Sequence, residues 1–146
     1  MLPVRLPALR RLPLPAGGGR RRPGPRIGVD LIAVAKVRRV FQDRPALQAQ
    51  VFTAGELAYA TGQRRPFLHL AARFAAKEAV LKGLGTGLAG GMTWQDVETV
   101  RGLRGEPRLR LSGETARLAR RAGFRRYAVS LSHSEEYALA AVLLAP

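Results

Sequence analysis

Lysine is rare in this chain, and its placement is the first indication of chemistry. Lys77 and Lys82 fall within six residues, although the chain contains three lysines against 22 arginines. The lysine ammonium is a compact point charge suited to a phosphate oxygen or a departing group, whereas arginine presents a planar fork. The clustering favours a site that requires primary ammonium groups, and chance clustering of so few lysines is the alternative.

Lys77 falls within an apolar stripe of a predicted long helix, Phe67 to Leu84. Apolar residues recur around it at spacings of three and four, which is typical of one helix face: Leu70, Phe74, Leu81 and Leu84. Because burial of an unpaired ammonium is prohibitive, Lys77 must either reach the surface or meet an anion. Glu78 and Lys82 are four residues apart on a neighbouring face, where a simple surface ion pair is one interpretation.

An acidic residue interrupts the first predicted strand. From Ile27 the chain alternates, so that Ile27, Val29 and Leu31 point one way while Asp30 and Ile32 point the other. Asp30 could accept backbone hydrogen bonds at the strand end. Alternatively, it could pair with Glu78 as an oxygen ligand of Mg²⁺, a cation that binds through one or two carboxylates plus waters and substrate phosphate. Two carboxylates specify no metal by themselves.

The remaining candidates are weaker. His133 follows a predicted strand, and an exposed turn residue is its default interpretation; His69 is assigned to helix packing or the surface. The glycines between Gly83 and Gly91 could let backbone amides approach a phosphate. They lack the P-loop spacing, so a flexible connector is the simpler interpretation.

The pattern along the chain predicts a mixed α+β domain. Thr53 and Glu56 form a capping box for a short helix. Ser112 can cap a later helix that runs to Ala122, with Gly123 as its C-terminal stop. The other expected elements are a strand from residue 27, a helix that stops near Arg44-Pro45, the long helix 67–84, strands near 97–100 and 108–111, and a closing hairpin of 127–132 and 137–144.

Length and composition set further limits. A chain of 146 residues suits one ordinary domain. It has no cysteine, which excludes disulfides, thiolate zinc sites and cysteine nucleophiles. No apolar run approaches the roughly 20 residues of a membrane-spanning helix, so we expect a soluble, cytoplasmic protein without membrane association. The net charge of +15 is expected to attract polyanions or acidic partners.

The charge is unevenly distributed. Residues 1–26 contain seven arginines and no acidic residue among many prolines and glycines, which predicts a disordered extension ahead of a domain at 27–146. The domain keeps 18 basic and 10 acidic residues, a net charge of +8. A non-functional extension, or a start site assigned too early, is one interpretation of residues 1–26. A tether to nucleic acid or to an acidic surface is another.

Residues 27–146 resemble the bacterial holo-[acyl-carrier-protein] synthase family of 4′-phosphopantetheinyl transferases. The resemblance rests on blocks that occur in the right order and spacing. These blocks are Ile27-Gly28-Val29-Asp30-Leu31, Arg73-Phe74-Ala75-Ala76-Lys77-Glu78-Ala79 continuing to Lys82 and Gly85-Thr86-Gly87, Gly105-Glu106-Pro107, and Val129-Ser130-Leu131-Ser132-His133. The family resemblance implies the phosphopantetheinyl transferase fold, a mixed sheet around a long central helix.

The resemblance also implies a reaction. A serine of apo acyl carrier protein attacks the β-phosphate of Mg²⁺-bound coenzyme A, phosphopantetheine is transferred and 3′,5′-ADP leaves, in support of fatty acid or polyketide biosynthesis. Asp30 and Glu78 would hold the metal, and Glu78 could also accept the serine proton, directly or through a water. Lys82 would stabilise charge on the leaving phosphate. Residues implied in coenzyme A binding are Arg73, Lys77 and His133 at the phosphates, Gly105 and Pro107 beside the adenine, and Arg65 toward either partner.

The family resemblance has implications for partners as well. Basic residues of the first helix would offer a docking face for the acidic carrier protein: Lys36, Arg38, Arg39 and Arg44. A homotrimer with sites between subunits is implied. Ala33 stands where an acidic or polar residue is frequent, and Glu106 stands where a basic one is frequent. These departures could remove a water contact near the metal and weaken nucleotide binding.

Two other functions compete with the transferase. The high positive charge suggests a nucleic-acid-binding protein, but stacking aromatics are few and no helix-turn-helix or zinc spacing occurs, so nucleic acid is the less favoured partner. A catalytically inactive relative that binds coenzyme A or a carrier protein is the other alternative.

Overall fold

The computed structural model describes residues 23–146, and the extension predicted for residues 1–26 lies almost wholly outside them. Residues 23–25 have no regular structure, and the first strand begins at Arg26. The elements in chain order are β1 (Arg26–Ala33), α1 (Val34–Phe41), α2 (Pro45–Val51), α3 (Ala54–Thr61), α4 (Pro66–Leu84), the 3-10 turn η1 (Trp94–Asp96), β2 (Val97–Arg101), β3 (Pro107–Leu111), α5 (Gly113–Arg121), β4 (Arg126–His133) and β5 (Tyr137–Ala145).

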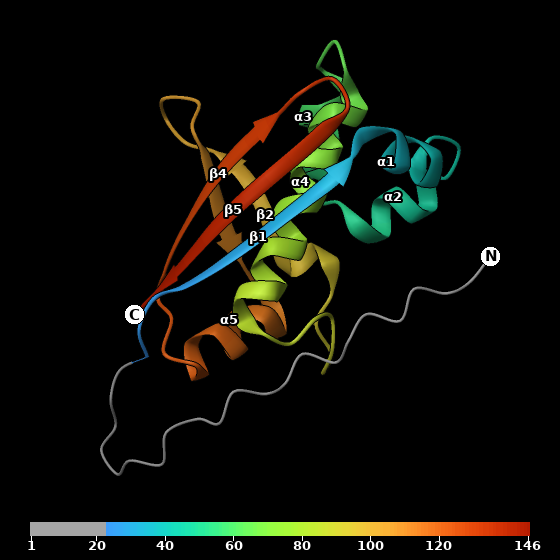
Figure 1. Cartoon of the computed structure of the whole chain (residues 1–146). Helices are drawn as coiled ribbons and strands as arrows, with labels where there is room; N and C mark the ends of the chain where they lie inside the picture. Colours follow the sequence, from blue (N-terminus) through green and yellow to red (C-terminus); the bar gives the residue numbers. More distant parts are fainter. Residues whose placement is uncertain (1–22) are drawn as a thin grey trace, which may run out of the picture.

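A three-stranded antiparallel sheet in the order β1-β5-β4 packs one face against the long helix α4 (Figure 1). Asp30 of β1 lies opposite Ala140 of β5, and His133 of β4 lies opposite Ala138. β2 and β3 form a separate antiparallel hairpin. The helices α1, α2 and α3 lie toward one end of α4, and α5 lies toward the other (Figure 1). The predicted α+β architecture around a long central helix is confirmed.

The closest approach of β1 to α4 depends on a glycine. A Cβ at position 28 would overlap the carbonyl oxygen of Ala79 and lie 2.8 Å from the backbone nitrogen of Gly83. The strand therefore lies directly on the helix backbone at this point. Since Asp30 is two residues further along β1, it points to the same side of the strand as Gly28 and toward α4. Small residues at 28, 79 and 83 thus position the acidic side chain.

Several local predictions are confirmed and two need correction. The Thr53–Glu56 capping box opens α3 as predicted. Ser112 occupies the N-cap of α5, but its side chain makes no capping hydrogen bond; instead the Asp96 carboxylate accepts from the Thr115 backbone amide at 3.1 Å. The sequence also did not predict α2. Pro45 marks the end of the previous helix, but it also stands at the first helical position, where its missing amide donor has no cost.

The opposite face of the sheet is apolar and exposed. Ile27, Val29 and Leu31 have 71%, 46% and 60% of their surface accessible. Leu143 and Tyr137 of β5 are similarly exposed, at 40% and 47%. The core is instead formed by α4 with the inward side chains of the sheet and hairpin. Within residues 23–146, no helix combines the length and apolar character needed to cross a membrane.

Candidate active site

The structure brings together Asp30, Glu78 and Lys82 at the contact between β1 and α4. The Lys82 ammonium lies 2.7 Å from an Asp30 carboxylate oxygen. The Lys82 side chain is about half exposed, whereas that of Asp30 is 13% exposed. Glu78 is partly buried one helical turn before Lys82. Asp30 thus shares one polar site at the edge of the sheet with Glu78 and Lys82, although Lys82 is 52 positions away in the sequence.

Burial is the main influence on the Glu78 carboxyl. Desolvation raises the pKa of the Glu78 carboxyl above its ordinary value, and the nearby Asp30 charge raises it further. Lys82 and Lys36 act in the opposite direction, yet the net direction remains upward. A carboxylate with a raised pKa is a better proton acceptor than an ordinary surface glutamate. A cation bound beside Glu78 would also reduce the repulsion between the Glu78 and Asp30 carboxylates.

The donor set at Asp30 and Glu78 fits Mg²⁺. Within residues 23–146, no cluster of three or more His, Cys, Asp or Glu side chains forms a metal site of its own. Two carboxylates without histidine or cysteine provide hard oxygen donors, and they leave most coordination positions for water and a substrate phosphate. Mg²⁺ typically binds in this way, whereas structural Ca²⁺ or Zn²⁺ sites require more protein ligands.

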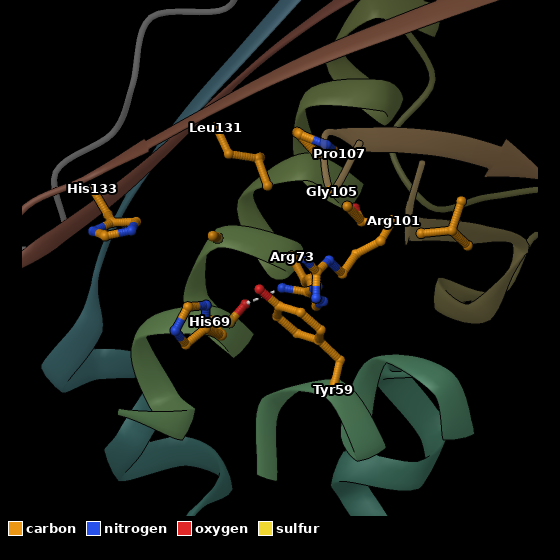
Figure 2. Close-up of a pocket in the computed structure, with 11 residues that line it drawn as sticks. Tyr59, His69, Arg73, Arg101, Gly105, Pro107, Leu131 and His133 are labelled. Atoms are coloured by element: carbon orange, nitrogen blue, oxygen red, sulfur yellow. Dashed lines mark hydrogen bonds between the residues drawn. The ribbon is translucent and has the colours of Figure 1, made fainter. Parts of the chain in front are cut away.

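A pocket of about 190 Å³ lies on another side of α4, between α3, β2 and β4 (Figure 2). None of its described lining residues is acidic. They are Tyr59, His69, Ala72, Arg73, Thr99, Val100, Arg101, Gly105, Pro107, Leu131 and His133. Two guanidinium groups, two imidazoles and an aromatic ring suit an anionic ligand with a planar group. The sequence predicted Arg73, Gly105, Pro107 and His133 here, but it missed Tyr59, Thr99 and Arg101.

Arg73 is the most buried cation of this pocket. Its Cζ lies 3.9 Å from the centroid of the Tyr59 ring, and Nη1 donates to the His69 carbonyl at 3.3 Å. Only 5% of Arg73 is exposed, and desolvation lowers the pKa of its guanidinium. Among residues 23–146, two buried side-chain polar atoms have no hydrogen-bond partner, Arg73 Nε and Thr99 Oγ1. Both atoms belong to residues that line this pocket, so its wall contains buried polar groups whose hydrogen-bonding capacity is not met within the chain.

Two histidine rings lie edge to face at the β4 side of the pocket. The His69 and His133 rings have centroids 6.2 Å apart, and His69 also lies edge-on to Tyr59 at 5.5 Å. Desolvation lowers the pKa of His69, with smaller contributions from Arg73 and His133. The sequence assigned His69 to packing or the surface. Its place four residues before Arg73, one turn along the same helix, was the available signal.

The hairpin that joins β2 to β3 closes the pocket with Gly105 and Pro107. Gly105 has φ +84°, a left-handed conformation that favours glycine, and its Cβ position would lie 2.9 Å from an Arg101 nitrogen. Glu106 accepts a hydrogen bond from the Arg104 amide at 3.0 Å and another from Arg108 Nε at 2.8 Å. Glu106 is thus engaged within the hairpin, and its acidic side chain has local basic partners.

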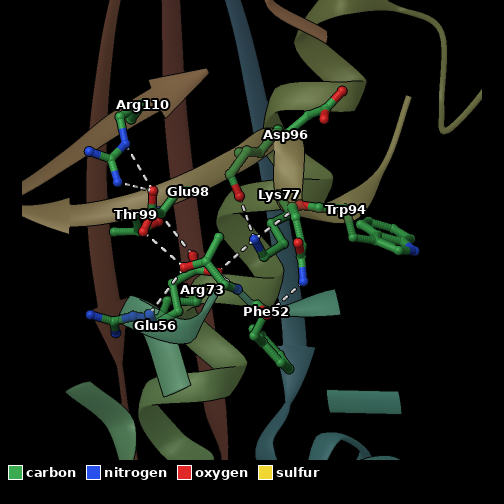
Figure 3. Close-up of polar contacts among 12 residues, drawn as sticks. Phe52, Glu56, Arg73, Lys77, Trp94, Asp96, Glu98, Thr99 and Arg110 are labelled. Atoms are coloured by element: carbon green, nitrogen blue, oxygen red, sulfur yellow. Dashed lines mark hydrogen bonds and ion pairs between the residues drawn. The ribbon is translucent and has the colours of Figure 1, made fainter. Parts of the chain in front are cut away.

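Lys77, which the resemblance implied at a coenzyme A phosphate, is not among the residues that line the pocket. Its side chain is fully buried, and its ammonium is 2.7 Å from Glu56, whose side chain is also fully buried (Figure 3). It also donates to the Trp94 carbonyl at 3.1 Å and to the Val97 carbonyl. Of the two outcomes considered for this lysine, surface or anion, the anion is the one found. That anion is a carboxylate of this chain.

Arg65 also lies outside the pocket. It precedes α4 and forms an ion pair with Glu135 in the turn between β4 and β5, at 3.0 Å, with both side chains more than half exposed. The structure therefore provides a protein partner for Arg65, and this pair is accessible to solvent. Arg65 belongs neither to the pocket nor to the site formed by Asp30, Glu78 and Lys82, which is called the carboxylate site below.

The carboxylate site and the pocket face different sides of α4. Glu78 follows Arg73 by five residues, which corresponds to about 7.5 Å along the helix and about 140° around its axis. Asp30 is on β1 and His133 is on β4, and these strands flank β5 on opposite sides. Within one chain, the two sets of residues therefore do not form one continuous cavity.

Known proteins resemble this chain over most of its length. Residues 26–142 match the model of the 4′-phosphopantetheinyl transferase superfamily. The holo-[acyl-carrier-protein] synthase of Moorella thermoacetica is 46% identical over 117 residues, which cover 80% of this chain and 91% of that protein.

Solved structures of holo-[acyl-carrier-protein] synthases are also similar to this chain. A Bacillus anthracis holo-(acyl-carrier-protein) synthase in complex with CoA (3′,5′-ADP) aligns with a TM-score of 0.67 and 31% identity, covering 82% of this chain and 94% of that one. An ACPS-CoA complex from Chronobacterium ammoniagenes aligns with a TM-score of 0.74 and 27% identity, covering 84% and 98%.

Proposed function

The chain belongs to the holo-[acyl-carrier-protein] synthase family of 4′-phosphopantetheinyl transferases, and we propose that it transfers 4′-phosphopantetheine from coenzyme A to a serine of an apo acyl carrier protein. The products would be the holo carrier protein and 3′,5′-ADP. The observation that carries this proposal is the convergence of Asp30, Glu78 and Lys82, two carboxylates and an ammonium, at the contact of β1 with α4.

The reaction forms one bond and breaks one. The serine Oγ attacks the β-phosphorus of coenzyme A, the bond from that phosphorus to the oxygen bridging the two phosphates breaks, and its electron pair leaves with 3′,5′-ADP. Glu78 accepts the serine proton, directly or through a water. Lys82 stabilises the negative charge on the leaving phosphate. Mg²⁺ held by Asp30 and Glu78 would supply neutralisation of the pyrophosphate charge.

The pocket between α3, β2 and β4 supports binding of the nucleotide part of coenzyme A. Arg73 and His133 would contact phosphate oxygens, each charge-assisted hydrogen bond contributing about 1.5–3 kcal/mol. Gly105 and Pro107 would border the adenine. The proposal does not assign a phosphate to Lys77, because its three ammonium protons already have protein acceptors.

The carrier protein would dock on α1. Lys36, Arg38 and Arg39 are exposed on this helix, and Arg44 is exposed directly after it. Lys36 acts electrostatically on Glu78, so the basic face borders the carboxylate site. An acidic carrier protein would be attracted to this face, and its serine would be delivered beside Glu78.

A homotrimer would unite the two halves of the site. The carboxylates and the nucleotide pocket face different sides of α4 within one chain, so a complete site requires a neighbouring copy. The exposed apolar sheet face of Ile27, Val29, Leu31 and Leu143 supports such a contact, because a face of this kind is typical of protein interfaces. We propose that three copies pack through this sheet face.

The proposed reaction would supply holo carrier protein to fatty acid or polyketide biosynthesis in the cytoplasm.

The decisive experiment mixes the protein with coenzyme A, Mg²⁺ and an apo carrier protein, and detects added phosphopantetheine by mass spectrometry. We expect modification that depends on Mg²⁺ and is lost in Asp30→Ala and Glu78→Ala. Transfer that persists in both variants would contradict the metal assignment. Binding of coenzyme A without transfer would indicate an inactive relative. Binding to DNA at moderate salt without modification of any carrier protein would favour the nucleic-acid alternative.

A further inference from the structure

We propose that Lys77 and Glu56 form a buried positioning pair that assembles the nucleotide pocket without touching the nucleotide. The inference rests on the proposed function, because it concerns how that pocket binds coenzyme A. It assigns to the first lysine of the helix motif a role different from phosphate binding. Glu56 is a residue that the sequence suggested only as a helix cap.

Every donor of the Lys77 ammonium is satisfied by this chain. The three acceptors are a Glu56 carboxylate oxygen at 2.7 Å, the Trp94 carbonyl at 3.1 Å and the Val97 carbonyl. An ammonium has three donors, so none is left for a phosphate. Both members of the pair are fully buried, and a ligand phosphate would have to displace protein groups to reach Lys77.

Glu56 connects three elements through its two carboxylate oxygens. One oxygen accepts from the Thr99 backbone amide of β2 at 2.9 Å. The other accepts from the Thr53 amide at the start of α3 at 3.1 Å and binds Lys77 of α4 (Figure 3). The elements α3, α4 and β2 therefore meet at this pair. The same three elements supply most of the polar wall of the nucleotide pocket.

The spacing of the residues links the pair to that wall. Tyr59 follows Glu56 by three residues on α3, and Arg73 precedes Lys77 by four residues on α4, so each lies one helical turn from a member of the pair. The Tyr59 ring and the Arg73 guanidinium stack at 3.9 Å. The Glu56–Lys77 ion pair and the Tyr59–Arg73 stack thus join α3 to α4 at points one helical turn apart. Loss of the ion pair would let Tyr59 and Arg73 move, and the pocket wall that they form with Thr99 would change its geometry.

Amine labelling of the wild-type protein tests the burial directly. The chain has three lysines, Lys36, Lys77 and Lys82, so each can be followed by mass spectrometry. We expect Lys36 and Lys82 to react with acetic anhydride in the folded protein, and Lys77 to react at least about tenfold more slowly with or without 3′,5′-ADP. Labelling of Lys77 in the free protein that 3′,5′-ADP suppresses would overturn the proposal.

Calorimetric titration with 3′,5′-ADP tests the positioning role. Lys77→Met should weaken binding by about 10- to 100-fold, because it leaves Glu56 unpaired and the wall misplaced. Adding Glu56→Gln keeps an acceptor for Thr99 and removes the unpaired charge, so the double variant should recover to within about threefold of wild type. Arg73→Met is the comparison for direct contact, and its binding should lose salt dependence.

The outcomes separate this proposal from the proposed function. If the double variant regains wild-type thermal stability and yet binds 3′,5′-ADP as weakly as Lys77→Met, the ammonium contacts the ligand and the positioning role is wrong. If wild-type protein binds no 3′,5′-ADP, the proposed nucleotide pocket itself fails. Recovery of binding in the double variant, together with an unreactive Lys77, supports the positioning pair.

Discussion

Lys77 and Lys82 are five residues apart on one helix, and their surroundings are opposite. Lys77 is fully buried with three protein acceptors, whereas Lys82 is about half exposed and contacts one carboxylate beside Glu78. Lys77 therefore stabilises the fold, whereas Lys82, on the same helix, is accessible to a substrate. Sequence spacing identified both lysines as unusual, but the neighbouring elements determine which of them can meet a substrate.

The largest expected effect is at Glu78, in the carboxylate site that contains the exposed Lys82. Glu78→Gln should reduce transfer of phosphopantetheine by about 10³-fold or more, because it removes both a metal ligand and the proton acceptor. The protein should remain folded, which circular dichroism checks. A variant that retains a tenth of wild-type kcat would show that Glu78 has neither role.

At the buried lysine, Lys77→Met should lower the stability of the fold in addition to weakening 3′,5′-ADP binding. Removing one member of a buried ion pair leaves an uncompensated charge and costs about 3–5 kcal/mol. For a domain of this size the thermal midpoint should fall by about 10 °C or more. Scanning calorimetry measures the change. A thermal midpoint within 2 °C of wild type would mean that Glu56 finds another partner or that the pair contributes little.

Lys82→Met provides the matched substitution at the exposed position. We expect kcat to fall by about 10²-fold, because charge on the leaving phosphate loses its stabilising ammonium. The thermal midpoint should change by less than about 3 °C, since the pair with Asp30 is partly open to solvent. The comparison fails if Lys82→Met unfolds the protein as readily as Lys77→Met does.

The pH dependence of the thermal midpoint tests the environment of Glu78 in the carboxylate site. The folded protein raises the pKa of Glu78, so the protonated form contributes stability at low pH, and that contribution is lost as the pH rises through the folded-state pKa. In the presence of a chelator, Glu78→Gln should therefore match wild type at low pH and melt at a higher temperature near neutrality. Added Mg²⁺ should reduce this difference by stabilising only the wild type.

The smallest effect is expected for the exposed ion pair of Arg65 and Glu135. Glu135→Ala should change the free energy of unfolding by less than about 1 kcal/mol, because solvent screens a pair with both side chains more than half exposed. Urea denaturation measures it. The same variant tests the role predicted for Arg65, because release of Arg65 should strengthen coenzyme A binding only if this arginine contacts the ligand.

Periodicity and local signals were enough to predict most of the fold. The long helix, the capping box at Thr53 and the closing hairpin depend on neighbouring residues, so they could be recognised in the sequence. The helix α2 could not be recognised so readily, because Pro45 both ends one helix and begins the next. The N-cap position of α5, Ser112, was predicted correctly, but the group that accepts from the first-turn amide of Thr115 is Asp96, which comes from a distant turn.

The sequence by itself determined that Asp30 and Lys77 were unusual for their positions, because a charged residue in an apolar pattern is visible from the order of residues alone. Only the tertiary structure decided which charges meet. The match of Lys77 with Glu56, the stacking of Tyr59 on Arg73 and the close approach of β1 at Gly28 all join distant segments. Electrostatic and steric partners are set by distance in space, and the spacing of residues along one chain does not specify it.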